Sequence, residues 1–268
     1  MLRVRGFTQD DAHIICTPEQ IGEEVKRTLD FALFLMRAFG YQEFEVDLSV
    51  RAEDHSHYMG SDADWDLAER SLAEALDSRG VAYHRAPGEA IFYGPKIDVK
   101  LRDSMGRLWQ GPTIQFDFNL TSRFHMEYMD AAGGRSTPLM IHRALLGSME
   151  RFVGGLVEHY AGAFPVWLAP VQVRLLPIAD RHHDYARQVA ACLQEAGARV
   201  EVDDRKATTG AKIRDGELER IPYLLVVGNR EQESGAVSVR QRGAGDQGAQ
   251  PLSAFLERLL PELSPPYS

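Results

Sequence analysis

Polar side chains recur at every second position near the start of the chain, in the sequence RVRGFTQDDAHIIC at residues 3–16. In an extended strand, side chains two residues apart share a face. One face would then carry Phe7, Gln9, Asp11, His13 and Ile15. An amide, a carboxylate and an imidazole in one row form a polar stripe, and burying such groups costs free energy unless they find partners. The stripe is either a site for polar chemistry or a solvated strand face.

Three further segments combine strand or turn character with unusual polarity, namely IFYGPKI (91–97), QGPTIQ (110–115) and IHRALLGSMERF (141–152). In the last of them, Arg151 follows Gly147 by about one helical turn, at a helix start where free backbone N–H groups favour anions. This position suits a phosphate, although an arginine in a helix is more often a surface residue.

A long amphipathic helix is expected directly after the opening stripe. Thr17 is a good capping residue, Pro18 suits the first helical position, and Gln20 completes a capping box. The apolar positions then recur with helical spacing at Ile21, Val25, Leu29, Ala32, Leu33 and Met36. Gly40 should end the helix.

The rest of the first half mixes strands and helices. Alternating patterns predict strands at residues 43–50, 97–101, 108–110, 113–118 and 138–141. A helix capped by Ser61 should run to Gly80, and another should run from Gly147 to about Tyr160. Helices and neighbouring hairpin strands together predict an α+β domain on a largely antiparallel sheet.

The sequence AGAFPVWLAP at residues 161–170 marks the expected domain boundary, which gives domains at 1–164 and 165–268. The pattern then changes. Strands are expected at 171–178, 199–202, 223–227 and 236–240, and helices at 183–195, 211–220 and 252–260. This order predicts a compact α/β unit with a mixed sheet.

The composition excludes several classes of protein. A formal net charge of -9 argues against indiscriminate binding to nucleic acid or to anionic membranes, although a local basic patch remains compatible with it. Only two cysteines occur, Cys16 and Cys192, so a reducing cytoplasm is expected. The first residues are not expected to act as a signal peptide, and no run in the given sequence approaches 18 apolar residues.

The polar segments together resemble the threonyl-tRNA synthetases, which are class II aminoacyl-tRNA synthetases. RVRGFTQDDAHIIC resembles the second half of motif 2 of that family, and IHRALLGSMERF resembles its motif 3. FYGPKI and QGPTIQFDF resemble strands of the family's active site, and the region from Pro170 to Leu260 resembles its anticodon-binding domain. The order and spacing of these motifs also match.

The resemblance implies how threonine is recognised. His13 and His142 match two positions that bind a zinc ion in the family, and imidazole suits zinc. Threonine is expected to bind that zinc through its amino group and its hydroxyl, with Asp11 receiving the hydroxyl and with Gln9 and Tyr93 around the polar end. A site that requires the hydroxyl rejects valine by roughly ten-thousand-fold, because its own polar groups would be left unpaired.

The resemblance also implies activation of threonine by ATP, with magnesium, and transfer of the amino acid to threonine tRNA. Arg151 matches the motif 3 arginine that faces the triphosphate, and Phe7 matches the aromatic residue that stacks on adenine. Further nucleotide-side or substrate-side positions match Arg3, Lys96, Gln110, Thr113 and Gln115. Positioning and neutralising the phosphate charge would supply most of the rate.

In the second domain, the family's anticodon-reading positions match Lys206, Arg214, Glu231 and Arg240. Donors and a carboxylate acceptor suit the base edges of an unstacked loop. Lys206 departs from the asparagine that is common there. Arg205 and Lys212 are expected to contact phosphates.

Parts of the family pattern have no match here, among them motif 1 with its dimer interface, the first half of motif 2 with its arginine, a cysteine zinc ligand and the editing domain. The complete family enzyme is a homodimer. Because these parts have no match, this chain is expected to be a fragment that does not activate threonine at a useful rate by itself. The main interpretation is a threonine–tRNA ligase. One alternative is a synthetase-like module that binds tRNA without catalysis, and another is a class II synthetase for proline or histidine, against which FTQDDAH and His142 argue.

Overall fold

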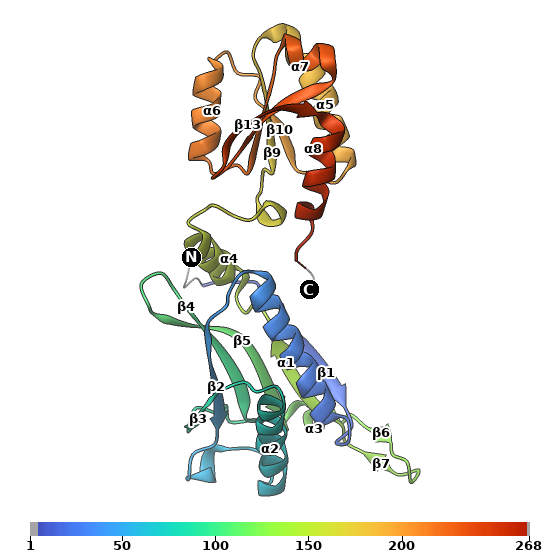
Figure 1. Cartoon of the computed structure of the whole chain (residues 1–268). Helices are drawn as coiled ribbons and strands as arrows, with labels where there is room; N and C mark the ends of the chain where they lie inside the picture. The colour runs from blue at the N-terminus through green and yellow to red at the C-terminus, as the bar shows by residue number, and fades with distance from the viewer. Residues whose placement is uncertain (1–4, 267–268) are drawn as a thin grey trace. The chain divides into compact units, whose positions relative to one another are not determined.

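The computed structural model describes residues 5–266, and the chain divides between Leu156 and Val157 into two compact units. Each unit combines helices with its own β-sheet, so the expected α+β fold followed by an α/β unit is confirmed (Figure 1). The domain boundary expected between residues 164 and 165 stays a prediction. Within residues 5–266, no helix has the length and apolar character needed to cross a membrane.

The first unit is built on a six-stranded sheet in the order β1-β8-β5-β4-β2-β3. All neighbouring strands run antiparallel except β2 and β3. The strands are β1 (Ala12–Cys16), β2 (Phe44–Val50), β3 (His84–Pro87), β4 (Lys96–Arg102), β5 (Leu108–Asp117) and β8 (Leu139–Ala144). Because β1 pairs with β8, the opening stripe lies beside the segment that resembles motif 3.

The register of this sheet gathers polar side chains into a row. His13 on β1 lies opposite His142 on β8, and His142 lies opposite Gln115 on β5. Gln115 in turn lies opposite Lys96 on β4. Directly opposite residues project from the same face of a sheet, so one face carries a polar row across four strands. We call it the polar face.

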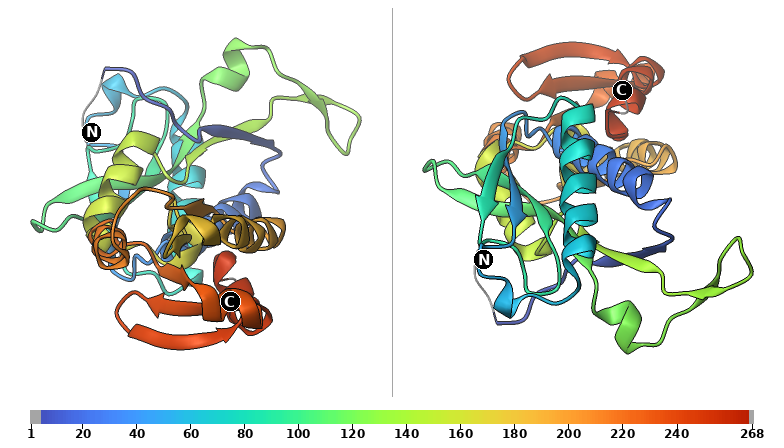
Figure 2. Two further views of the ribbon diagram at one scale, coloured as in Figure 1. Left: turned by 90° about the horizontal axis from the view of Figure 1, so that it is seen from above. Right: turned by 90° about the horizontal axis from the view of Figure 1, so that it is seen from below.

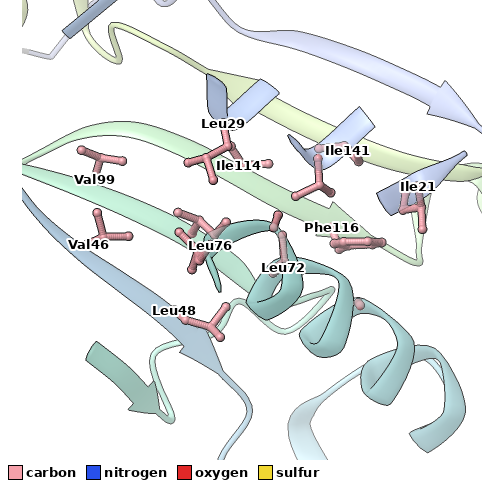
Figure 3. Close-up of a cluster of buried hydrophobic side chains, with 14 of the residues drawn as sticks. Ile21, Leu29, Val46, Leu48, Leu72, Leu76, Val99, Ile114, Phe116 and Ile141 are labelled. Atoms are coloured by element: carbon pink, nitrogen blue, oxygen red, sulfur yellow. The ribbon is translucent and has the colours of Figure 1, made fainter. Parts of the chain in front are cut away.

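The other face of the sheet forms the core of the unit. Helices α1 (Ile21–Ala38) and α2 (Asp62–Ser78) lie side by side against it (Figure 2). Figure 3 shows leucines of the two helices packed over strand residues of the apolar face, with these side chains labelled: Ile21, Leu29, Val46, Leu48, Leu72, Leu76, Val99, Ile114, Phe116 and Ile141. Each fully buried aliphatic side chain contributes about 1.5–3 kcal/mol to stability.

The helix ends follow the expected signals, with one difference. All six apolar positions expected on α1 are buried, and Gly40 follows the helix with a φ of 91°. Gln20 Oε1 accepts from the Thr17 backbone at 3.0 Å, as in the expected capping box. Residues 18–20 nevertheless form a turn, and the helix itself begins at Ile21. Before α2, Ser61 and Asp64 form a complete capping box.

The remaining elements of the first unit are short. They are η1 (His55–His57), α3 (Leu120–Arg123), β6 (Tyr128–Met129), β7 (Arg135–Ser136) and the first part of α4 (Met149–Tyr160). The β6–β7 hairpin extends away from the sheet in both views of Figure 2. The sequence did not predict β3, α3 or this hairpin, and the two strands expected at 108–110 and 113–118 form the single strand β5.

The second unit contains a mixed five-stranded sheet in the order β10-β9-β11-β12-β13, as expected. Its strands are β9 (Val173–Pro177), β10 (Val200–Val202), β11 (Tyr223–Val227), β12 (Ala236–Gln241) and β13 (Gly245–Pro251). Its helices are α5 (His183–Glu195), α6 (Thr209–Leu218), α7 (Asn229–Ser234) and α8 (Leu252–Leu259), with 3-10 turns η2 (Val166–Leu168), η3 (Asp180–His182) and η4 (Leu260–Leu263). Only α7, β13 and the 3-10 turns were not predicted.

Candidate active site

A cavity of about 570 Å³ lies on the polar face of the first sheet. Its walls are formed by Phe7, Gln9, Ile91, Lys96, Gln110, Gly111, Thr113, Gln115, Ala144, Gly147, Ser148 and Arg151. Seven of these residues carry a nucleotide or threonine role in the resemblance, namely Phe7, Gln9, Lys96, Gln110, Thr113, Gln115 and Arg151. The structure thus brings together four segments that are far apart in the sequence. Arg3 lies outside the described residues.

The carboxylate of Asp98 holds three of the lining side chains. Asp98 Oδ1 accepts hydrogen bonds from Gln110 Nε2 at 2.7 Å and from Thr113 Oγ1 at 3.2 Å. Asp98 Oδ2 lies 2.6 Å from Lys96 Nζ, and Asp98 itself is only 4% exposed. A buried carboxylate needs such partners. Because an ammonium has three donors, Lys96 keeps donors for a ligand in the cavity.

A chain of hydrogen bonds continues from Asp98 along the polar face. The Tyr93 hydroxyl donates to Gln115 Oε1 at 2.9 Å, and Gln115 Nε2 donates to Thr113 Oγ1 at 2.9 Å. Burial raises the pKa of Tyr93, and the nearby negative charges of Asp117 and Asp11 raise it further. Tyr93 therefore stays protonated near neutral pH and fixes the amide orientation of Gln115.

Residues 8–10 are hydrogen-bonded to the loop that leads into α4. The Asp10 carboxylate accepts from the backbone N–H groups of Leu145 at 2.8 Å, Leu146 at 3.0 Å and Gly147 at 3.2 Å. In return, the Glu150 carboxylate accepts from the Thr8 backbone at 3.0 Å and 3.1 Å. Gly147 has a φ of 71°, which favours glycine. These bonds fix the start of α4 at the edge of the cavity.

Arg151 lies on the first turns of α4 and lines the cavity, as expected for a residue that faces phosphate. Its Nη1 donates to the Gln110 carbonyl at 3.4 Å, and its guanidinium stands 5.6 Å from the centre of the Trp109 ring. Such a cation–π contact stabilises an arginine in one orientation. Phe7 also lines the cavity, from the segment that precedes β1. It is 56% exposed, so its ring is accessible for stacking on a flat ligand.

Two histidines and a carboxylate converge at the β1 edge of the polar face. The ring centroids of His13 and His142 lie 4.2 Å apart, and one potential ligand atom from each of Asp11, His13 and His142 lies within 4.8 Å of the others. Two imidazoles and a carboxylate form a donor set that suits Zn²⁺. The family resemblance implies that Asp11 receives the substrate hydroxyl, and in the structure Asp11 also lies among the potential metal ligands.

Cys16 does not belong to this donor set. It lies on the apolar face, is 6% exposed, and burial raises the pKa of its thiol to about 11, with the charge of Glu24 as a smaller cause. A thiol with such a pKa is protonated at neutral pH and is a poor zinc ligand.

Several residues of the site were missed by sequence reasoning, namely Asp10, Asp98, Trp109, Asp117 and Ser148. The alternation that singled out Thr113 and Gln115 continues to Asp117, so the same signal marks this carboxylate. The sequence marks Asp98 less clearly. A bulge between Asp98 and Lys100 determines which residues of β5 lie opposite it, and this bulge is not visible in the alternating pattern.

In the second unit, the candidate anticodon residues are spread over the sheet and its helices. Lys206 and Arg214 are exposed, in the loop after β10 and on α6. Arg240 on β12 lies near Glu217 at 3.8 Å and Asp246 at 3.5 Å, opposite the start of β11. Glu231 follows the end of β11 and caps α7 by accepting from the Gly228 backbone at 2.9 Å. Glu231 and Arg240 therefore lie at opposite ends of β11.

One expectation for the second unit is wrong. Lys212 is 3% exposed, and its ammonium donates to the backbone carbonyls of Asp203 at 2.8 Å and Pro177 at 3.2 Å. It joins the ends of β9 and β10 and does not reach a phosphate from there. Arg205 is exposed but already paired with Asp203 at 2.7 Å and Asp215 at 3.0 Å.

Comparisons with known proteins agree with both units. The profile of the tRNA synthetase class II core domain (G, H, P, S and T) matches residues 1–160, and that of the anticodon binding domain matches residues 172–262. The threonine–tRNA ligase of Acidobacterium capsulatum is 57% identical over 259 residues, which are 96% of this chain and 38% of that protein. The threonine–tRNA ligase of Aquifex aeolicus is 52% identical, over 96% of this chain and 40% of that protein.

Solved structures give the same result. The RNA binding domain of threonyl-tRNA synthetase from Cryptosporidium parvum superimposes with a TM-score of 0.90 at 38% identity, over 99% of this chain and 66% of that one. A putative threonyl-tRNA synthetase from Aeropyrum pernix gives a TM-score of 0.79 at 30% identity, over 99% of this chain and 66% of that chain. The chain thus spans about two fifths of the length of the two curated bacterial relatives.

Proposed function

Since the chain belongs to the threonine–tRNA ligase family of class II aminoacyl-tRNA synthetases, we propose that it takes part in ATP-dependent activation of threonine and its transfer to threonine tRNA. One observation supports this proposal above the others. The polar face joins a candidate amino-acid site at His13 and His142 to a cavity lined by Lys96 and Arg151, so the two reactants of adenylate formation would bind side by side.

In this proposal, Asp11, His13 and His142 would hold a zinc ion, and the ion would supply a Lewis acid for threonine. Asp11 would also accept a hydrogen bond from the hydroxyl of threonine. Tyr93 and Gln115 form the polar wall beside this site, and their hydrogen bond fixes which atoms they offer. Valine offers no hydroxyl, so these groups would stay unpaired and valine would be rejected.

The cavity would bind ATP with magnesium. Phe7 offers an exposed ring for the adenine, while Arg151 and Lys96 offer positive charge to the phosphates. The Asp98 carboxylate holds Lys96, and the Gln110 carbonyl holds Arg151, before the nucleotide arrives. Preorganised charges of this kind lower the barrier because they need no rearrangement in the transition state.

The second unit would bind the anticodon of threonine tRNA. Its candidate residues are Lys206, Arg214, Glu231 and Arg240.

Arg240→Ala should relax discrimination between anticodons by about 1–3 kcal/mol, because an arginine that reads a base edge is lost. Binding of threonine tRNA and of an anticodon-changed tRNA, measured by filter binding, checks this. Leu218→Ala on the exposed surface of α6 is the control, and equal losses for both tRNAs from Arg240→Ala would contradict the role.

The cellular setting is also part of the proposal. The two cysteines are free, and Cys16 is buried in the core, so a reducing cytoplasm suits this chain. A homodimer is proposed for the complete enzyme, and sedimentation at several protein concentrations tests whether this chain forms one by itself.

Threonine-dependent exchange between pyrophosphate and ATP tests the catalytic proposal, with valine in place of threonine as the control. Exchange is measured on the chain and on a version extended upstream through motif 1. We expect little exchange by the chain itself, and in the extended version we expect exchange with threonine to exceed exchange with valine by roughly ten-thousand-fold. ATP binding by the chain is measured alongside by calorimetry. ATP and tRNA binding without exchange by either version would favour the module that binds tRNA without catalysis, and equal exchange with both amino acids would contradict threonine as the substrate.

A further inference from the structure

We propose that Asp117 is a positioning residue that fixes the tautomer of His142, with the proton on Nε2 and a free lone pair on Nδ1 beside His13 and Asp11. Its relevance to threonine binding rests on the proposed function. The tautomer itself can be measured without metal, substrate or activity, so the two proposals can fail separately.

Each oxygen of the Asp117 carboxylate has its own fixed partners. Oδ2 lies 2.7 Å from His142 Nε2. Oδ1 accepts from the backbone N–H groups of Asn119 at 2.7 Å and Leu120 at 2.9 Å. Asp117 is 2% exposed, at the last position of β5, and the His142 side chain is 16% exposed. The carboxylate is therefore anchored to the backbone and cannot turn away from the imidazole.

The partner decides where the imidazole proton lies. A carboxylate only accepts hydrogen bonds, so His142 Nε2 has to donate. In a neutral imidazole the other nitrogen, Nδ1, then carries the lone pair. The strand pairing holds the ring beside His13. Histidines that bind metals use this arrangement, with one nitrogen on the metal and the other N–H on a carboxylate.

A single change of side-chain atom should reverse the tautomer. In Asp117→Asn, the amide oxygen has to stay on Asn119 and Leu120, because an amide NH₂ there would meet two donors. The NH₂ group then points at His142, which has to accept at Nε2 and carry its proton on Nδ1. The shape of the side chain is nearly unchanged, so packing does not explain such a reversal.

Nuclear magnetic resonance of the chain with ¹⁵N-labelled histidine tests this without metal. Spectra are recorded near pH 8.5, well above the ordinary histidine pKa of about 6.5. For wild type we expect the Nε2–H tautomer at His142, and for Asp117→Asn the Nδ1–H tautomer. Asp130→Asn is the matched control, since Asp130 also accepts from backbone N–H groups, of Ala132 and Gly134, in the β6–β7 hairpin, and it should leave His142 unchanged.

Two results would overturn the proposal. One is an Nδ1–H tautomer, or an even mixture, at His142 of the wild-type chain. The other is an unchanged tautomer in a folded Asp117→Asn variant, with folding checked by circular dichroism. The first result needs no variant, so the proposal can be refuted even where Asp117→Asn fails to fold.

A zinc titration of the same samples tests the ligand atom. In wild type, the resonance of His142 Nδ1 should shift as zinc is added, and Asp117→Asn should bind zinc roughly 10- to 100-fold more weakly. Coordination at Nε2, equal affinities, or no zinc-dependent shift at Nδ1 would each overturn the assignment of Nδ1 as the ligand atom. None of these readouts depends on exchange activity.

Discussion

The two units each bury a charged side chain at the centre of a polar cluster, but the two clusters use their hydrogen bonds differently. In the first unit, Asp98 is 4% exposed and contacts Lys96, Gln110 and Thr113, which all line the 570 Å³ cavity. In the second, Arg174 is 8% exposed and pairs with Glu201 at 2.7 Å and Glu219 at 2.6 Å.

The comparison shows when a buried charge indicates a binding site. Arg174 donates from Nε, Nη1 and Nη2 to its two glutamates, and it thereby joins β9 to β10 and to the end of α6. The guanidinium is satisfied within its cluster, and the two half-exposed glutamates offer only acceptors to a cavity of about 310 Å³. The partners of Asp98 instead offer donors to the larger cavity. A buried charge thus indicates a site for an anion when its partners still have donors to offer.

Removal of the central charge of the first cluster should have the largest effect. Asp98→Ala should lower the free energy of unfolding by about 3 kcal/mol, because Lys96 loses its partner while its side chain is 14% exposed. It should also weaken ATP binding by at least about tenfold, which is 1.4 kcal/mol. Urea unfolding and calorimetry measure the two effects. If Asp98→Ala left the ATP affinity unchanged, the first cluster would not differ from the second in serving a ligand.

A second pair of variants compares two glycines with left-handed backbone, one in each unit. Gly147 has a φ of 71°, and an added Cβ would lie 3.3 Å from the Gly111 carbonyl. Gly235 has a φ of 64° with open space around it. Each change to alanine should cost about 1–2 kcal/mol of stability, because left-handed backbone disfavours a Cβ. Only Gly147→Ala should also weaken ATP binding, and a matching loss from Gly235→Ala would contradict the comparison.

The charge of the second cluster should matter less. Arg174→Met keeps much of the buried volume, and the freed Glu201 and Glu219 side chains, 51% and 55% exposed, can turn to water. We expect a loss of about 1 kcal/mol of stability, since pairs with exposed partners contribute little. Hydrogen exchange resolved by segment should place the loss in the second unit. A change in ATP affinity would show that this cluster also serves a ligand.

Acid should produce the smallest effect. Arg174 holds the pKa of Glu219 below its usual value, chiefly through their hydrogen bonds. A depressed folded-state pKa adds stability above the unfolded value of about 4.3, and this stability is lost as pH falls through the folded value. Screening limits the contribution to less than about 0.5 kcal/mol. The stability difference between wild type and Arg174→Met should therefore shrink from pH 6 to pH 3, as urea titrations can check, and a growing difference would refute this.

The spacing of apolar residues predicted most of the helices and strands, but fewer of their first and last residues. The stripe from Ile21 to Met36 marked α1, because helical spacing puts these residues on one face. The alternation around Ile97 and Ile114 marked strands of the apolar face. The hairpin β6–β7 was not predicted, because its strands have only two residues each and show no alternating pattern. Strand β13 was not predicted, because it is polar and mostly exposed.

The candidate site divides in the same way. The residue types at Gln9, Asp11, His13 and Arg151 were visible in the motifs, and with them the family resemblance. Lys212 shows what residue types alone do not predict. Its surroundings in the sequence are polar, but in the structure its ammonium is buried between backbone carbonyls at the ends of β9 and β10.

The sequence by itself therefore determined which face of each strand is polar, where most helices lie and which chemical groups are available, since these depend on spacing along the chain. The family resemblance already brought His13 and His142 to one site, and their ring centroids lie 4.2 Å apart. Tertiary structure alone decided that Asp98 gathers Lys96, Gln110 and Thr113, and that Asp117 anchors an imidazole. These contacts depend on the register between strands that lie up to about 130 residues apart in the chain, and register is set by the packing of the whole sheet against its helices.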